Sequence, residues 1–119
     1  MKLWVLSENT AAAGFSAEHG LSLYIEACDQ RILFDAGQST LFAENAEKLG
    51  LGLGEVDLAI LSHGHYDHGG GLTHFLALNT TAPIYLSRHA FEPHFNASGK
   101  DIGLDPTLPR DRIRFVEEN

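Results

Sequence analysis

The stretch ILSHGHYDHGGG, residues 60–71, constrains the fold of this chain more than any other part of the sequence. It places three histidines and one aspartate within six residues, at the end of the apolar run VDLAIL (56–61) and before a helix predicted over 72–78. A short apolar run of this kind predicts a buried strand. Because open α/β sheets carry their chemistry where a strand ends before a helix, the stretch predicts a layered α/β domain with a site at this strand end.

The rest of the sequence predicts further strands and one further helix around this site. Apolar residues recur on one face of residues 39–49, which predicts a helix with Ser39 as its N-cap and Gly50 just beyond its end. Residues 21–27 and 31–34 predict a β-hairpin with Asp29-Gln30 between its strands. Loops are expected over 7–20 and 88–110, and other strands at 2–6, 82–86 and 112–116.

The length and composition are those of one folded unit, and we take residues 1–119 as one domain or less. With 44% hydrophobic residues the chain can bury a core, and its net charge of −8 argues against nucleic acid or an anionic membrane as its main partner. The start MKLWVLSENT lacks the apolar run of a signal peptide, and no run is long enough to span a membrane. We therefore expect a cytoplasmic protein. The lone cysteine, Cys28, fits a reducing compartment and is interpreted as an inert strand-end residue.

The three histidines and the aspartate of the stretch have the donor atoms of a metal site. His63 and His65 are two residues apart, so in an extended segment both imidazoles point to the same side and can reach one metal ion. Asp67 and His68 follow as the chain turns and suit a second ion. Two ions about 3.5–4 Å apart can activate water and clamp a scissile ester or phosphoester. We expect two zinc ions, with iron or manganese as alternatives, because nitrogen and oxygen ligands serve all three metals.

The three glycines Gly69, Gly70 and Gly71 are expected at the N-terminus of the following helix. Glycine permits unusual backbone angles and close backbone approach. Free N–H groups at the start of a helix attract anions. We therefore hypothesise that this end of the helix helps to hold a carboxylate or phosphate of the substrate.

At this point the chain resembles a known family. The string His63-Gly64-His65-Tyr66-Asp67-His68 resembles the HxHxDH signature of the metallo-β-lactamase superfamily. The resemblance continues through "SENT", "EHGLSLYIE", "ILFDAGQS", "NAEKLG" and "LSHGHYDHGGGL". The Tyr variant and its flanks resemble the branch labelled 7,8-dihydropterin-6-methyl-4-(β-D-ribofuranosyl)-aminobenzene-5′-phosphate synthase-like, a group of metal-dependent hydrolases.

The resemblance implies a role for each residue of the motif. His63 and His65 would be ligands of the first metal, and Asp67 and His68 ligands of the second. Asp67 would also have a catalytic role, because in many members the motif aspartate helps to position the attacking water. Asp35, in "FDAG", matches the first short motif of the superfamily, which implies a carboxylate that orients the histidine loop. The alternative for Asp35 is a simple turn-forming Asp-Ala-Gly.

The other histidines are assigned lesser roles. His19 lies in the early loop, which can overhang the metal site, so a contact with substrate is one interpretation. His74 falls on the helix after the motif and is interpreted as a surface or packing residue. His89 and His94 follow the strand at 82–86, where the family has no ligand position.

The resemblance also implies that the chain is half of a domain. A complete member is an αββα sandwich of two similar halves, and the second half supplies further ligands that have no counterpart here. We expect the N-terminal half, a mixed sheet covered by helices on one side. Its open apolar face would cost about 25 cal/mol per Å² left wet. The chain should therefore form a homodimer, associate through this face with a missing piece, or aggregate.

Two functions follow. The first is a metal-dependent hydrolase of a small anionic ester or phosphoester, with a site completed by residues absent from this chain. The second is a truncated metal-binding half-domain without turnover. Three explanations remain for the missing half under either function: the chain is an expressed fragment, the product of a natural truncated gene, or one half of a self-completing dimer.

Overall fold

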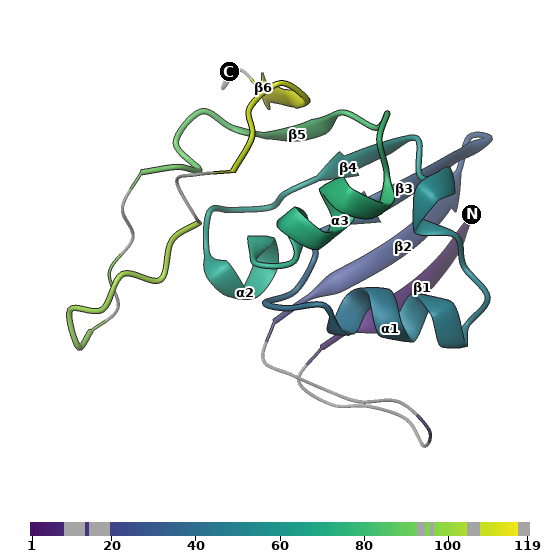
Figure 1. The fold of residues 1–119 in the computed structure, drawn as a ribbon, viewed down its shortest axis with the longest axis horizontal. Coiled ribbons are helices and arrows are strands. Elements are labelled where there is room, and N and C mark those ends of the chain that lie inside the picture. Colours follow the sequence, from purple (N-terminus) through teal and green to yellow (C-terminus); the bar gives the residue numbers. More distant parts are fainter. Residues whose placement is uncertain (9–13, 15–19, 93–94, 96, 105–107, 117–119) are drawn as a thin grey trace.

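The computed structural model describes residues 1–8, 14, 20–92, 95, 97–104 and 108–116. Within these ranges the chain forms one six-stranded sheet in the order β1-β2-β3-β4-β5-β6 (Figure 1). The strands are β1 (Lys2–Ser7), β2 (Ser22–Ala27), β3 (Gln30–Phe34), β4 (Leu58–Ile60), β5 (Ile84–Ser87) and β6 (Ile113–Val116). The helices are α1 (Leu41–Lys48), the 3₁₀ turn η1 (Leu53–Glu55), α2 (Tyr66–Gly69) and α3 (Leu72–Leu78).

The sheet is mixed, as expected for an α/β fold of this kind. Strands β1, β2 and β3 pair antiparallel, whereas β3, β4, β5 and β6 pair parallel. In Figure 1, α1 and α3 lie over the same face of the sheet. The core between these helices and the sheet includes Tyr24, Leu33, Phe42, Phe75 and Ile84, all nearly inaccessible to solvent. The burial of this apolar surface is the main stabilising contribution to the fold.

The other face of the sheet is apolar and only partly covered. Side chains that are neighbours across the strands form rows on this face, since the pairing register places Leu3 beside Ile25 and Ile25 beside Ile32. On β1, Leu3 is 50% exposed and Val5 is 46% exposed. The half-buried or exposed residues of this open face are Leu3, Val5, Leu23, Ile25, Ile32, Phe34, Leu58, Ile60 and Tyr85. The prediction of helices on one side of the sheet is thus confirmed.

Three local predictions need correction. Helix α1 begins at Leu41 with Thr40 at the N-cap position, and Ser39 instead accepts a hydrogen bond from the N–H of Leu41 at 3.4 Å. Strand β4 is three residues long, Leu58–Ile60, and therefore shorter than the strand predicted over 56–61. The β2–β3 turn consists of Cys28 and Asp29, since Ala27 pairs with Gln30.

The β2–β3 turn has a clear geometric reason. Both turn residues have positive φ, 53° at Cys28 and 61° at Asp29. Two-residue hairpin loops favour this left-handed conformation, because its twist matches that of the strands. Cys28 is therefore an exposed turn residue rather than a strand end. Among the helices of the described part of the chain, none is long and apolar enough to cross a membrane.

Candidate metal centre

The motif loop and Asp35 lie at the same edge of the sheet. Asp35 follows β3, the motif loop follows β4, and these two strands are parallel neighbours, so their carboxyl ends lie together. Two backbone hydrogen bonds connect these segments. The N–H of Asp35 donates to the carbonyl oxygen of Ile60 at 2.9 Å, and the N–H of Ala36 donates to that of His68 at 2.6 Å. The topology therefore brings residues 33 positions apart into one site.

Asp35 is the buried centre of a hydrogen-bond network. Its Oδ1 accepts the N–H of Ser62 at 2.7 Å, and its Oδ2 accepts the Ser62 hydroxyl at 2.6 Å. The same Oδ2 lies 2.7 Å from Nδ1 of His68. The backbone of Asp35 has φ 58°, a left-handed conformation that aspartate tolerates better than most residues. Asp35 thus lies in a turn, and its carboxylate is also hydrogen-bonded to Ser62 and His68 of the motif loop. A carboxylate that orients metal ligands is expected to make such contacts.

Three side chains of the motif form a group with metal-ligand spacing. His63, Asp67 and His68 each offer one ligand atom, and these atoms all lie within 4.8 Å of one another. Ligand bonds of about 2.0–2.2 Å place the donors of one zinc ion about 3–4 Å apart, so this spacing is close to that of a single ion's ligands. The donor set of imidazole nitrogens and a carboxylate fits zinc, iron or manganese.

The grouping differs from the pairing expected from sequence. His65 is adjacent, with its ring centroid 4.7 Å from that of His63, but it does not belong to the close group. The ring of His68 is nearer to His63, at 4.1 Å. The α2 turn causes this difference, because it begins at Tyr66 and folds Asp67 and His68 back toward His63. Oδ2 of Asp67 lies 3.8 Å from Nε2 of His68.

The electrostatic environment favours the ligand form of His63. Partial burial lowers the pKa of His63 below its ordinary value, and the neighbouring rings of His68 and His65 lower it further. A lowered pKa means that the neutral imidazole predominates at pH 7. Neutral imidazole is the form that binds metal ions.

The three glycines after the motif have a packing role. The N–H of each glycine donates to a backbone carbonyl oxygen: Gly69 to that of His65, Gly70 to that of Tyr66, and Gly71 to that of Gly37. These three N–H groups therefore have backbone acceptors, and the anion-binding role of this end of the helix stays a prediction. A Cβ on Gly70 would lie 2.4 Å from the carbonyl oxygen of Gln38, and one on Gly71 would lie 2.3 Å from that of Ala36. Close backbone approach to the β3–α1 connection is what requires glycine at these positions.

Segments distant in the sequence also hold the motif loop. A Cβ on Gly64 would lie 2.0 Å from the carbonyl oxygen of Ala90, so the chain after β5 lies directly against the motif. The N–H of Tyr66 donates to Ile102 at 2.8 Å. On the other side, the N–H of Leu21 donates to the carbonyl of Asp67 at 3.2 Å. Sequence reasoning missed the roles of Ser62 and Gly64, for which their places beside and between the motif histidines were the only signals.

The remaining histidines lie apart from the close group or outside the described residues. The ring of His74 packs edge-on against Phe42 with centroids 6.3 Å apart, in keeping with a packing role. Nδ1 of His89 lies 2.7 Å from the carboxylate of Glu92. His19 and His94 lie outside the residues that the structure describes, so the suggested substrate contact of His19 stays a prediction.

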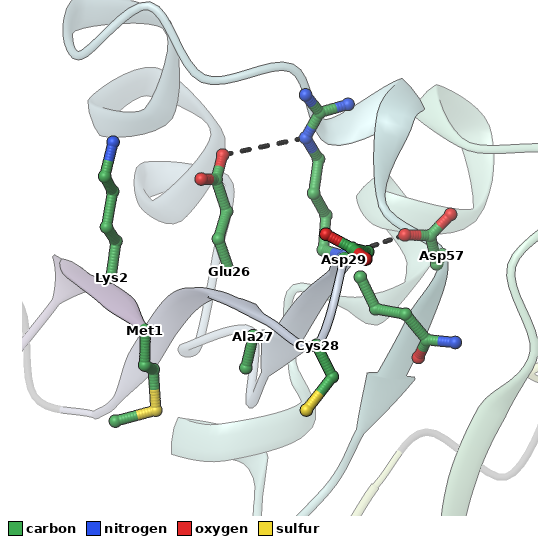
Figure 2. A pocket seen from close by; sticks show the side chains of 9 residues that line it. Met1, Lys2, Glu26, Ala27, Cys28, Asp29 and Asp57 are labelled. Atoms are coloured by element: carbon green, nitrogen blue, oxygen red, sulfur yellow. Dashed lines mark hydrogen bonds and ion pairs between the residues drawn. The ribbon is translucent and has the colours of Figure 1, made fainter.

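A surface pocket of about 590 Å³ lies at the opposite end of the sheet, beside the β2–β3 turn (Figure 2). Its lining includes Met1, Lys2, Glu26, Cys28 and Asp57. No motif residue contributes to this lining. The pocket is therefore separate from the candidate metal centre.

Known proteins share sequence similarity with almost the whole of this chain. The model of the metallo-beta-lactamase superfamily matches residues 16–118. The uncharacterized protein MJ0448 of Methanocaldococcus jannaschii is 36% identical over 96% of this chain and 46% of its own length. The 7,8-dihydropterin-6-methyl-4-(beta-D-ribofuranosyl)-aminobenzene-5'-phosphate synthase of the same organism is 34% identical over 93% of this chain and 42% of its own length. The chain thus spans less than half of these relatives.

Solved structures also share the fold of this chain over part of their own length. The crystal structure of Tm1679, described as a metal-dependent hydrolase of the beta-lactamase superfamily, superimposes with a TM-score of 0.77 and 33% identity. The match covers 98% of this chain and 42% of Tm1679. The fold also resembles that of MEM-A1, a subclass B3 metallo-beta-lactamase, with a TM-score of 0.61 over 82% of this chain and 40% of MEM-A1. This partial coverage fits the N-terminal half of the αββα sandwich.

Proposed function

This chain belongs to the metallo-beta-lactamase superfamily, and on that premise we propose that its motif loop holds divalent metal, zinc first, for hydrolysis of a small anionic ester or phosphoester. The observation that carries the proposal is the close group of His63, Asp67 and His68, with His65 beside it. The printed description of Tm1679 as a metal-dependent hydrolase supports the same reaction class. A synthase among the relatives, named for a 5'-phosphate compound, supports a substrate that carries phosphate.

The residues of the chain have distinct parts in this proposal. A divalent ion, when bound, supplies a water acidic enough to attack at neutral pH. His63, His65 and His68 provide nitrogen lone pairs, and Asp67 provides a carboxylate that also orients the attacking water. Asp35 fixes the ring of His68 through the 2.7 Å contact at Nδ1, which leaves Nε2 on the side of Asp67. The remaining ligands and the walls of the substrate site come from outside this chain.

Metal content and turnover test the proposal together. When the residues that complete the site are present, we expect zinc-loaded protein to hydrolyse bis(p-nitrophenyl) phosphate. We expect Asp67→Asn to lower both bound zinc and turnover, by about 100-fold for turnover, because a ligand and the water-orienting group are lost together. His89→Ala is the matched control, since it removes a histidine that pairs with Glu92 instead. Equal turnover in Asp67→Asn would contradict the proposal. Zinc bound without turnover would favour the alternative, a metal-binding half-domain.

The open face of the sheet supports a further part of the proposal, a homodimer. The nine residues of the apolar face defined above are uncharged, although the register places Arg114 of β6 beside Tyr85 at the edge of this face, and sandwich folds bury such a face against a second sheet. We propose that in this 119-residue chain a second copy covers the face. The association removes apolar surface from water at about 25 cal/mol per Å², which is the driving force for it.

Sedimentation analysis of a charged variant tests the homodimer. Val5→Lys places a charge on the open face at a residue that is already 46% exposed, so the fold should tolerate it. Glu47→Lys is the control, because it changes an exposed residue of α1 in the layer on the other side of the sheet. We expect dimers for the unmodified chain and for Glu47→Lys, and monomers for Val5→Lys. A monomeric unmodified chain at all concentrations, or a dimeric Val5→Lys, would overturn the homodimer.

A further inference from the structure

Ser62 lies between the buried carboxylate and the first histidine of the motif. Its hydroxyl oxygen is 2.6 Å from Oδ2 of Asp35 and 2.9 Å from Nδ1 of His63. Its backbone N–H donates to Oδ1 of Asp35 at 2.7 Å. The side chain of Asp35 is completely inaccessible to solvent, whereas His63 is exposed. Ser62 therefore connects the interior of the site to a candidate metal ligand at the surface.

The available protons determine the direction of each hydrogen bond. A carboxylate only accepts, and a hydroxyl has a single proton to donate. Because the Ser62 hydroxyl donates that proton to Asp35, its oxygen must accept a proton from Nδ1 of His63. The Nδ1 of His68 donates to the same Oδ2 of Asp35 in the same way. Both histidines then carry their proton on Nδ1 and the lone pair on Nε2.

We infer that Ser62 is a positioning residue that sets the tautomer of His63, so that one buried carboxylate orients two candidate metal ligands. The carboxylate of Asp35 acts directly on His68 and acts on His63 through the Ser62 hydroxyl. A neutral imidazole can bind a metal only through the nitrogen that carries the lone pair. The hydroxyl therefore makes Nε2 the metal-binding nitrogen of His63. The inference concerns a different residue from the motif ligands and rests on the proposed metal site.

The tautomer of each histidine is directly measurable in the metal-free protein. Long-range ¹H–¹⁵N correlation spectra distinguish Nδ1–H from Nε2–H rings when the imidazoles are neutral. In the unmodified protein we expect His63 and His68 both as Nδ1–H. In Ser62→Ala we expect His63 to become a mixture of tautomers while His68 keeps Nδ1–H, because its bond goes directly to Asp35. Ser62→Thr keeps the hydroxyl and should restore the spectrum of His63.

Zinc affinity, measured by competition with a chromophoric chelator, gives the second readout. Loss of an outer hydrogen-bond partner lowers metal affinity by about 10- to 100-fold, so we expect a loss of about 10-fold in Ser62→Ala and recovery in Ser62→Thr. An unchanged His63 tautomer in Ser62→Ala would overturn the inference, as would a changed tautomer with unchanged zinc affinity. Absence of zinc binding in the unmodified protein, with the tautomer change still present, would overturn the proposed function but not the tautomer assignment.

Discussion

Replacing Asp35 with asparagine is expected to weaken zinc binding by about 100-fold and to lower the free energy of unfolding by about 2 kcal/mol. Asparagine has nearly the same size as aspartate and tolerates the left-handed backbone at this position, where φ is 58°. The amide oxygen can keep the hydrogen bond from the N–H of Ser62. The change therefore alters the charge and donor pattern with little effect on shape.

The loss arises at the second oxygen of the carboxylate. Oδ2 of Asp35 accepts from the Ser62 hydroxyl and from Nδ1 of His68. In asparagine an NH₂ group takes this place, and it presents donors to two groups that are themselves donors. Either these bonds are lost, or His68 moves its proton to Nε2, the nitrogen on the side of Asp67. The first outcome leaves polar atoms without hydrogen-bond partners. The second outcome removes the lone pair on Nε2 with which His68 would bind the metal.

Chelator competition and urea denaturation measure the two effects. Asp57→Asn is the matched control, because Asp57 is also an aspartate that accepts from a backbone N–H but is exposed and distant from the motif. We expect Asp57→Asn to change zinc affinity by less than about 2-fold and stability by less than about 1 kcal/mol. Zinc affinity in Asp35→Asn equal to that of the control would contradict the role assigned to Asp35.

Replacing Gly64 with alanine is expected to be the most damaging single-methyl change in the motif. The added Cβ would lie 2.0 Å from the carbonyl oxygen of Ala90 and 2.7 Å from its carbonyl carbon. These are backbone atoms, so no side-chain rotation can relieve the overlap and one of the two segments must move. We expect stability to fall by about 2–3 kcal/mol, the upper part of the range for inserting atoms into packed sites. Zinc affinity should fall as well, because Gly64 lies between His63 and His65.

Gly54→Ala provides the control for this substitution. Its Cβ would meet Leu78 at 3.4 Å, an ordinary contact distance, so we expect a change in stability of less than about 1 kcal/mol. Thermal or urea unfolding of both variants measures the difference, and chelator competition measures zinc affinity. Unfolding midpoints that fall equally in Gly64→Ala and Gly54→Ala would show that the segment around Ala90 does not press on the motif loop.

Much of the fold could be predicted from the sequence because its main elements carry local signals. Helix α3 has the predicted bounds, and the strand before the motif was recognisable as an apolar run. The HxHxDH pattern identified the family, and the family implied the sandwich half and the orienting carboxylate. The position of Asp35 beside the motif follows from β3 and β4 being parallel neighbours.

The remaining features depend on contacts between distant segments, which no local pattern encodes. Spacing and resemblance both pair His63 with His65 on one metal, which stays a prediction, but neither shows that the α2 turn brings Asp67 and His68 close to His63. No local pattern predicts the packing of the glycines after the motif: carbonyl oxygens of the β3–α1 connection lie against Gly70 and Gly71, and a side chain of Leu104 lies against Gly69. The link from Asp35 through Ser62 to His63 required coordinates for all three side chains.

The central claim, that the motif loop is a divalent-metal site, is tested most directly by anomalous diffraction at the zinc edge from crystals grown with zinc. We predict a peak within about 2.0–2.2 Å of ligand atoms of His63, Asp67 or His68, the bond lengths of zinc to nitrogen and oxygen. In crystals of Asp67→Asn grown in the same way, this peak should be weaker or absent. A map with no peak at the motif loop, or with zinc bound only elsewhere on the surface, would contradict the claim.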